Sequence, residues 1–357
     1  MPRRYAISAL ACLLAVALLA GCGGGSDSSG STSADSRPAP LKSEFPQADG
    51  KTLREIVNDA DGHSELVVSP AALVFYKGEN RFPFGVFHPD RSQVDDAEVA
   101  LYVAKAPKPK GPGSGTAKNG KAIKGAQARA QEEALEQPAI GPFPAAIESL
   151  TTEPAFRAQT TADDPNAATV VYTSGLDFTS NGEWRIAALI KQGNETVATL
   201  LPSASVGEFK GVPRVGQKAP LIHTPTPDDV GGDLAKITTR VPPDTQNRVD
   251  YAEVLGKEPI FLLFATPQFC QSRVCGPVVD VAEQVKQQFG DKAAFIHMEI
   301  YNDNDPSKGV RPQVRAFHLP SEPWLFAIDR QGVVKGVVEG AFGVERMTKL
   351  VEKVIDE

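Results

Sequence analysis

Cys270 and Cys275 are the residues of this chain with the most distinctive chemistry. They are separated by four residues and lie between an apolar run, Ile260 to Ala265, and a segment of helical periodicity past Pro277. The run is short and apolar on both faces, as expected of a central strand covered by helices on each side. At a strand-to-helix junction, unpaired amide N–H groups and the helix dipole stabilise a thiolate and lower a cysteine's pKa. The position therefore predicts a reactive thiol.

The spacing of the two cysteines limits how they can pair. Beyond them, apolar residues recur at helical intervals, at Val278, Val281, Val285 and Phe289. Gly290 stands where the C-terminal cap of a helix would. Residues five apart in one helix are about 7.5 Å apart along its axis, and a disulfide needs Cα atoms within about 7 Å. A bridge therefore requires Cys270 in the turn before the helix and Cys275 in its first turn.

The chain begins with a segment typical of export. Arg3 and Arg4 precede an apolar run of roughly 15 residues, which is the length of a signal-peptide core and too short for a stable membrane span. The run ends in Leu19-Ala20-Gly21-Cys22, which resembles the lipobox of bacterial lipoproteins. The resemblance implies a signal peptide at 1–21 and a lipid on Cys22; a plain secretory signal is the alternative. Residues 22–40 have the composition of a flexible tether. We therefore expect a lipid-anchored protein on the extracytoplasmic face of a bacterial membrane.

Export restricts the roles left to the cysteines. Of four cysteines, Cys12 leaves with the signal and Cys22 carries lipid, so Cys270 and Cys275 remain. One pair in an oxidising compartment is either a structural disulfide or a redox couple. Loss of Arg3 and Arg4 takes the formal net charge from −7 to −9. An acidic chain disfavours nucleic acid as a partner, because phosphate recognition needs a concentrated basic face.

The length of 357 residues allows two domains, and the first, 41–210, has the pattern of a β-domain. A short helix is possible at Leu53 to Val57. Strand-like runs separated by turn signals cover Glu65 to Val68, Ala72 to Tyr76, Arg81 to Phe87, Ala97 to Ala104, Ala168 to Tyr172, Glu183 to Ile190 and Thr196 to Leu201. Such a series predicts a β-sandwich. The segments 85–87, 95–101 and 182–186 are similar to those of immunoglobulin-like domains of exported bacterial proteins. His63 and His88 stand alone and are expected in surface loops.

An insertion, 105–144, interrupts the strands of this domain. Its first half combines lysine with glycine and proline, a composition typical of disordered loops, and Ala126 to Glu136 could form a short helix. The lysines could contact anionic lipid headgroups, at about 1 kcal/mol per charge near the surface. A solvated loop is the preferred interpretation, because runs of charge are usually solvated.

The second region, 211–357, follows a different pattern. Val215-Gly-Gln-Lys-Ala-Pro220 resembles the opening of the TlpA-type and peroxiredoxin-like branches of the thioredoxin superfamily. The predicted order after it is a strand, the cysteine turn, a helix to Phe289, a strand, a loop with a helix, two more strands and a last amphipathic helix; the three later strands are Ala294 to Ile300, Trp324 to Ile328 and Val333 to Val338. The resemblance implies an α/β thioredoxin-like fold with Pro323 at the cis-proline position and no cofactor.

The chain departs from that family at the site itself. Thioredoxins have Cys-x-x-Cys at this turn, whereas here four residues separate Cys270 from Cys275. Leu262 and Leu263 stand where the family has a buried carboxylate. With Pro323 in the cis-proline position, the fold would bring Glu322 against the cysteine turn, where a carboxylate would raise the thiol pKa by like-charge repulsion.

Three functions remain open from the sequence. The first is thiol–disulfide exchange with exported protein thiols or disulfides, in which Cys270 attacks, Cys275 resolves, and Glu322 and Pro323 belong to the site. The second is a non-catalytic binding module with a structural disulfide. The third is copper handling of the Sco type, which would use Cys270, Cys275 and His318, with His297 as another candidate. Neither histidine lies in a spacing that identifies a metal site.

Overall fold

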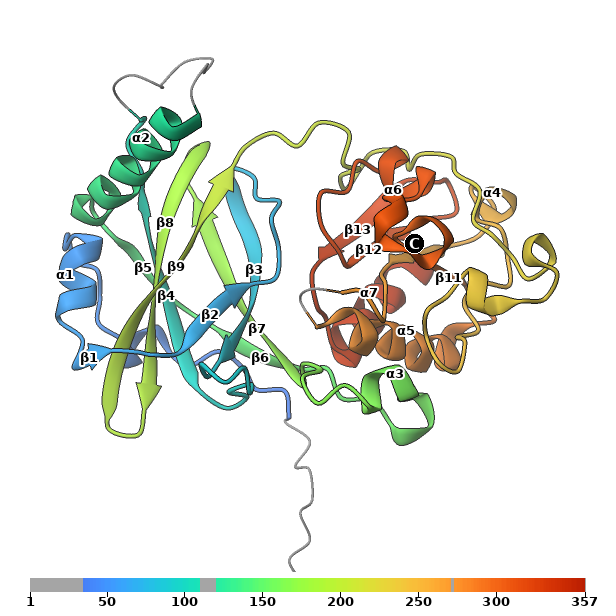
Figure 1. Ribbon diagram of the computed structural model, residues 1–357, viewed down its shortest axis with the longest axis horizontal. Coiled ribbons are helices and arrows are strands. Elements are labelled where there is room, and N and C mark those ends of the chain that lie inside the picture. Colours follow the sequence, from blue (N-terminus) through green and yellow to red (C-terminus); the bar gives the residue numbers. More distant parts are fainter. Residues whose placement is uncertain (1–34, 110–119, 271–272, 357) are drawn as a thin grey trace, which may run out of the picture. The chain divides into compact units, whose positions relative to one another are not determined.

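The first half of the chain folds into two β-sheets (Figure 1). The computed structural model describes residues 35–109, 120–270 and 273–356; Cys22 lies outside them. One sheet has the order β1-β9-β8-β4-β5 and the other β2-β3-β7-β6. Their bounds are β1 Gly62–His63, β2 Val67–Pro70, β3 Gly78–Phe87, β4 Glu98–Lys105, β5 Ile140–Pro144, β6 Ala146–Ser149, β7 Val170–Phe178, β8 Gly182–Gln192 and β9 Glu195–Val206. The accompanying helices are α1 Leu53–Asn58, α2 Gly120–Glu133 and α3 Gln159–Ala162.

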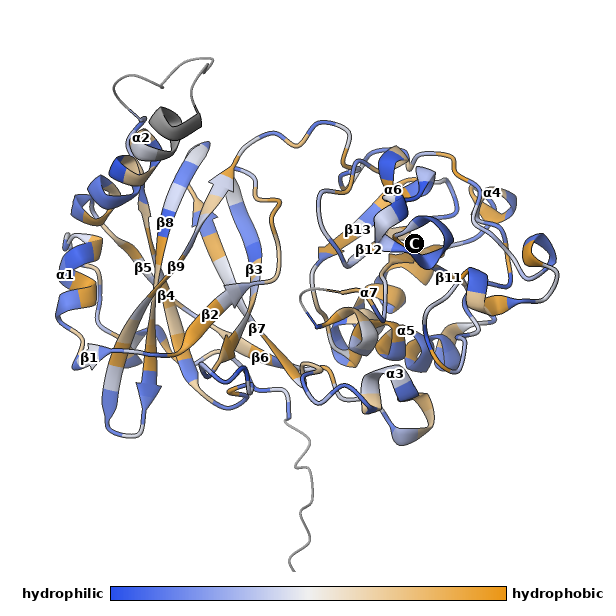
Figure 2. Ribbon diagram, in the orientation of Figure 1, coloured by the Kyte–Doolittle hydropathy of each residue, from blue (hydrophilic) through white to orange (hydrophobic). Residues whose placement is uncertain are grey.

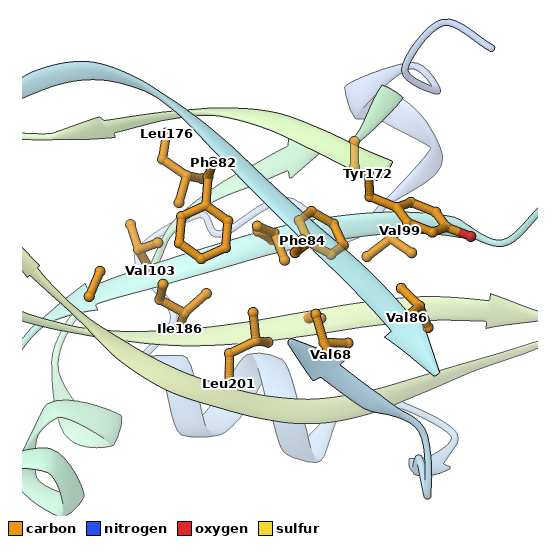
Figure 3. Packing of buried hydrophobic residues seen from close by; sticks show 14 of the residues in the cluster. Val68, Phe82, Phe84, Val86, Val99, Val103, Tyr172, Leu176, Ile186 and Leu201 are labelled. Carbon is orange, nitrogen blue, oxygen red and sulfur yellow. The ribbon is translucent and has the colours of Figure 1, made fainter. Parts of the chain in front are cut away.

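The two sheets share one apolar core (Figure 3). Phe82, Phe84 and Tyr172 from one sheet and Val103 and Ile186 from the other belong to the same cluster and are fully buried. Each aromatic side chain of this size removes about 150–250 Å² of surface from water when buried. The predicted sandwich is therefore confirmed as two sheets packed face to face.

Some details of the sandwich differ from the prediction, among them one predicted strand and the predicted insertion. Ala72 to Tyr76 is not a strand, because the amides of Leu73 and Val74 donate to the carboxylate of Glu339 at 2.8 and 3.0 Å. The predicted insertion, 105–144, is partly ordered: it contains α2, and its end forms β5, which pairs with β4. This strand was not predicted because Pro142 and Pro144 interrupt the strand pattern of its sequence. The two prolines are tolerated because β5 lies at the edge of its sheet.

The second half contains one mixed sheet of order β11-β10-β12-β13. Strand β10 pairs parallel with β11 and antiparallel with β12, and β12 pairs antiparallel with β13. The elements are α4 Tyr251–Val254, β10 Ile260–Phe264, α5 Cys275–Phe289, β11 Ala294–Met298, α6 Pro312–Ala316, β12 Trp324–Ile328, β13 Val334–Glu339 and α7 Val344–Ile355. This is the order of elements that the thioredoxin-like resemblance implied. Strand β11 ends two residues earlier than expected.

Both faces of this sheet are covered. Side chains of α5 and α7 pack with Phe261 and Leu263 on one face, and Tyr251 and Phe317 pack with Phe264 on the other. Helix α5 alternates between hydrophobic and hydrophilic residues (Figure 2), as expected of a helix with one face on a core. Double coverage explains why β10 is apolar at every position.

Helix α5 begins at Cys275 and holds Pro277 in its first turn. Proline is tolerated there because the first N–H groups of a helix have no intrahelical acceptor. Among the helices that the structure describes, none is both long and apolar enough to cross a membrane.

Candidate functional site

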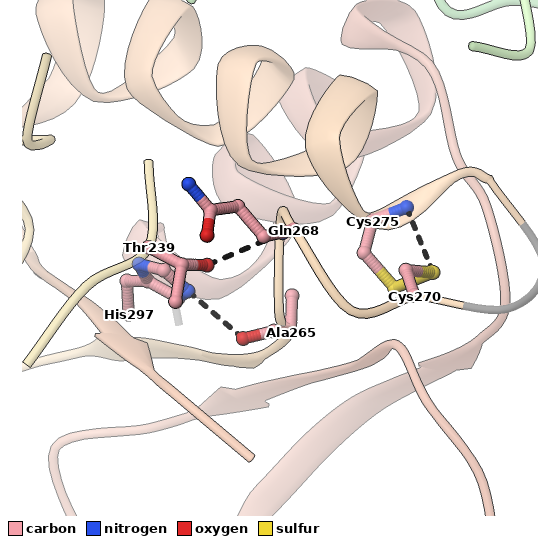
Figure 4. Close-up of a disulfide and its surroundings, with 6 residues drawn as sticks. All are labelled: Thr239, Ala265, Gln268, Cys270, Cys275 and His297. Carbon is pink, nitrogen blue, oxygen red and sulfur yellow. Dashed lines mark hydrogen bonds between the residues drawn. A yellow bond between two sulfur atoms is a disulfide. The ribbon is translucent and has the colours of Figure 1, made fainter. Parts of the chain in front are cut away.

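Cys270 and Cys275 form a disulfide at the N-terminus of α5 (Figure 4). Their Cα atoms are 5.8 Å apart. Cys270 precedes the helix and Cys275 is its first residue, which confirms the arrangement that the spacing required. The two sulfur atoms differ in environment, because Cys275 is 0% exposed and Cys270 is only partly buried.

The helix N-terminus acts on Cys270 directly. The backbone N–H of Cys275 donates to Cys270 Sγ, with 3.3 Å between nitrogen and sulfur (Figure 4). An amide that points at a sulfur, together with the positive end of the helix dipole, stabilises negative charge there. The geometry therefore favours Cys270 as the residue that carries the thiolate.

Glu322 lies beside the two cysteines. A carboxylate oxygen of Glu322 and the sulfur atoms of Cys270 and Cys275 all lie within 4.8 Å of one another. The peptide bond between Glu322 and Pro323 is cis. The structure thus brings together Cys270, Cys275 and Glu322, and it gives Pro323 the conformation that the sequence predicted.

The charge of Glu322 differs from the expectation. Burial raises its pKa to about 8, and the nearby carboxylate of Glu299 adds to the effect. At pH 7 Glu322 is therefore mostly a neutral acid. The like-charge repulsion that the sequence suggested between Glu322 and a thiolate operates only above about pH 8.

Another buried carboxylate lies near the site, although Leu262 and Leu263 leave β10 without one. Glu299 follows β11, is 1% exposed, and accepts hydrogen bonds from Thr239 N at 2.7 Å and Thr239 Oγ1 at 2.6 Å. The same hydroxyl oxygen accepts from Gln268 N at 3.2 Å in the cysteine turn (Figure 4). The sequence pattern did not identify Glu299, because it lies outside the apolar run where the family carries its acid.

His297 forms a buried ion pair under the same turn. Its Nδ1 lies 2.9 Å from Asp244 Oδ2, and its Nε2 lies 3.1 Å from the carbonyl oxygen of Ala265 (Figure 4). Burial opposes the charged imidazolium, but the charge of Asp244 outweighs it and raises the pKa of His297 to about 9. Burial likewise opposes ionisation of Asp244, but His297 and the hydrogen bonds lower the pKa of Asp244 to about 2. The protonated ring donates from both nitrogens and fixes the end of β10.

We expect this pair to make stability depend on pH. The pKa of His297 is raised from 6.5 to about 9, so its contribution is complete below pH 6.5 and is lost as the pH rises through 9. The pKa of Asp244 is lowered from 3.8 to about 2, so its contribution is present above pH 3.8 and is lost as the pH falls through 2. The free energy of unfolding should therefore separate wild type from His297→Gln most at pH 4 to 6.5. Urea unfolding at pH 5, 7 and 9.5 measures this, and a difference that stays constant up to pH 9.5 would contradict it.

His318, the alternative metal ligand, is not part of the cysteine group. It follows α6 in a left-handed conformation with φ of 53°, is exposed, and lies against Gly211, where an added Cβ would clash with its ring. Among the described residues, the side chain that groups with Cys270 and Cys275 as a potential metal ligand is Glu322. The ligand set expected for copper handling is therefore not assembled here.

No family model matches this chain, and no curated protein matches it. Several solved structures are similar to part of it, and two of them are described here. One is a thiol:disulfide interchange protein of the thioredoxin family from Chlorobium tepidum TLS, with 18% identity and a TM-score of 0.29, covering 40% of this chain and 97% of that one. The other is a putative thiol:disulfide interchange protein DsbE from Chlorobium tepidum, with 14% identity and a TM-score of 0.29, covering 40% of this chain and 99% of that one.

Proposed function

We propose that the protein is a thiol–disulfide oxidoreductase that acts on exported protein thiols or disulfides through Cys270 and Cys275. The observation that carries the proposal is the asymmetric disulfide at the N-terminus of α5, with Cys275 buried and its amide donating to Cys270 Sγ. A less buried sulfur can meet a partner, and a buried sulfur beside it can complete the exchange.

The reaction balances as two thiolate attacks. In the reducing direction, the thiolate of Cys270 attacks one sulfur of a partner disulfide, and the partner's other sulfur leaves as a thiolate. The thiolate of Cys275 then attacks Cys270 Sγ, which closes the internal disulfide and releases the second partner thiol. Two electrons pass to the partner, and the reverse sequence oxidises a partner dithiol.

A direct test uses the reduced mature chain and a peptide disulfide that carries a fluorophore and its quencher. The expected result is a second-order rate constant well above that of free dithiothreitol, because the helix N-terminus stabilises the attacking thiolate. A rate no greater than that of the free dithiol would overturn the proposal. The matched control is the chain in which the bridge between Cys270 and Cys275 is closed.

We also propose that the chain is anchored by lipid on Cys22 at the extracytoplasmic face of a bacterial membrane. The support is the sequence Leu19-Ala20-Gly21-Cys22 after the apolar run. Cys22→Ala should release the protein from membranes or leave its signal unprocessed. Recovery of the wild type wholly in the soluble fraction would refute the anchor.

We propose that the sandwich, residues 41–210, is an immunoglobulin-like domain. We propose that residues 211–357 form the thioredoxin-like domain. The support for the first is a pair of mainly antiparallel sheets around an aromatic core that includes the buried Trp184.

A further inference from the structure

Cys270, Cys275 and Glu322 together form a set of potential metal ligands. One ligand atom from each lies within 4.8 Å of the other two. In a tetrahedral zinc site, Zn–S bonds of about 2.3 Å and Zn–O bonds of about 2.0–2.2 Å put ligand atoms roughly 3.5–3.8 Å apart. Small side-chain rotations after reduction would bring these atoms to that spacing. The three residues come from the cysteine turn, the start of α5 and the segment two residues before β12, so a cation would tie three segments together.

We propose that the reduced protein binds a divalent zinc ion through Cys270 Sγ, Cys275 Sγ and a carboxylate oxygen of Glu322. The inference goes beyond disulfide exchange and shares one requirement with it, namely that the bridge can be reduced. In the disulfide each sulfur is bonded to the other, so neither is a thiolate ligand. Binding is therefore specific to the dithiol state.

The surroundings of Glu322 support a cation at this point. Glu322 Oε2 is buried and accepts no hydrogen bond from the described residues, and the same is true of Glu299 Oε2. Glu299 is 1% exposed and close enough to act on the charge of Glu322. A buried acceptor without a partner is unfavourable, because it has given up its hydrogen bonds to water. A divalent ion would give Glu322 a partner and balance the negative charge of two thiolates.

The ligand types select zinc over copper(I). Cu(I) prefers soft thiolate and thioether ligands, whereas zinc accepts thiolate and carboxylate together. Three protein ligands leave a fourth position open for water or a partner group. The Cys275 amide that donates to Cys270 Sγ at 3.3 Å would belong to the outer shell that orients such a site.

Zinc would then oppose oxidation of the pair. A dithiol reductant supplies two electrons and two protons to the disulfide, and zinc, when it binds, displaces the two thiol protons and the proton that the Glu322 carboxyl group mostly carries at pH 7. Free zinc at 100 times its dissociation constant shifts the equilibrium between disulfide and dithiol about 100-fold toward the dithiol. At 29.6 mV per tenfold change, this raises the reduction potential by about 59 mV.

The test is an anaerobic titration of the reduced, mature chain with Co²⁺ as a spectroscopic probe, followed by displacement with Zn²⁺. We expect one ion per chain, a thiolate-to-metal charge-transfer band in the near ultraviolet, and the strong visible bands of four-coordinate cobalt. The oxidised chain should show none of these. Cys270→Ser and Cys275→Ser should each lose the charge-transfer intensity of one thiolate and bind at least tenfold more weakly.

Glu322→Gln is the decisive variant, and it should weaken binding at least tenfold while both thiols stay reactive. Glu322→His, which restores a zinc ligand, should recover affinity and so exclude misfolding as the cause. Glu253→Gln on the exposed face of α4 and His318→Ala are matched controls that should bind like wild type. Wild-type affinity in Glu322→Gln, or cobalt bound without a thiolate band, would overturn the proposal.

The outcomes also separate this site from the oxidoreductase. Binding is measured at equilibrium on chemically reduced protein, so it does not depend on exchange activity. A chain that binds cobalt but exchanges no disulfides supports the metal site and refutes the oxidoreductase. A chain that exchanges disulfides but binds no cobalt supports the oxidoreductase and refutes the metal site. A bridge that resists every reductant overturns both.

Discussion

Replacement of Cys275 by serine should produce a protein that stops at the mixed disulfide with its partner, whereas replacement of Cys270 should abolish exchange. The reason lies in the environments of the two sulfur atoms. Cys270 is only partly buried and receives the N–H of Cys275, so it can meet a partner as a stabilised thiolate. Cys275 is 0% exposed and is bonded to Cys270, so it can attack the mixed disulfide on Cys270 but cannot meet a partner itself. Without Cys275 the first attack proceeds and the second cannot.

Non-reducing gels and mass spectrometry of each variant after reaction with a protein disulfide measure this. Cys275→Ser should accumulate a covalent adduct that dithiothreitol releases, and Cys270→Ser should react at the rate of the uncatalysed reaction. The double variant controls for adducts that involve other groups. An adduct on Cys270→Ser but not on Cys275→Ser would reverse the assignment, and no adduct on either would contradict the exchange mechanism.

Arg240→Ala should destabilise the protein by about 3–5 kcal/mol, because removal of one partner leaves a buried charge uncompensated. Arg240 Nε donates to Asp280 Oδ1 on α5 at 2.9 Å, and the two side chains are 6% and 1% exposed. The other guanidinium nitrogens donate to the carbonyl oxygens of Pro242 at 2.8 Å and Phe156 at 2.7 Å. One side chain therefore joins the loop before α4, the helix that carries Cys275 and the segment before α3.

Urea unfolding at pH 7 measures the change in the free energy of unfolding. The double variant Arg240→Ala with Asp280→Ala should be less destabilised than the sum of the single variants, since removing both charges leaves neither unpaired. Arg54→Ala is a matched control, because Arg54 pairs with Glu132 and Glu136 on an exposed surface and its loss should change stability little. An Arg240→Ala protein as stable as Arg54→Ala would contradict the assigned role of the buried pair.

The second half of the fold was predictable because each element carries its own local pattern. Strand β12 has the expected bounds, because an apolar run marks it, and the predicted last amphipathic helix is present as α7. In the sandwich the local pattern was less informative. The prolines of β5 concealed a strand, and Ala72 to Tyr76 was wrongly predicted because its amides bond to Glu339, a residue more than 250 positions away.

The site was predictable where the fold brings known positions together, and not where distant polar residues meet. The family resemblance placed Glu322 beside the cysteines, but its neutral state at pH 7 follows from burial, which a sequence does not show. The pair of His297 with Asp244 joins residues 53 positions apart, and the bond from Thr239 to Glu299 joins residues 60 apart. The local sequence around each of these residues does not indicate its distant partner.

The reduction potential of the Cys270–Cys275 pair tests the proposed function most directly. It is measured on the purified mature chain, with chelator present, by equilibration in redox buffers followed by alkylation and mass spectrometry. We predict a value within the range of catalytic thioredoxin-like proteins, about −120 to −270 mV, with both thiols released together. A potential below about −300 mV would show that the bridge is a structural disulfide and would contradict a role in thiol–disulfide exchange.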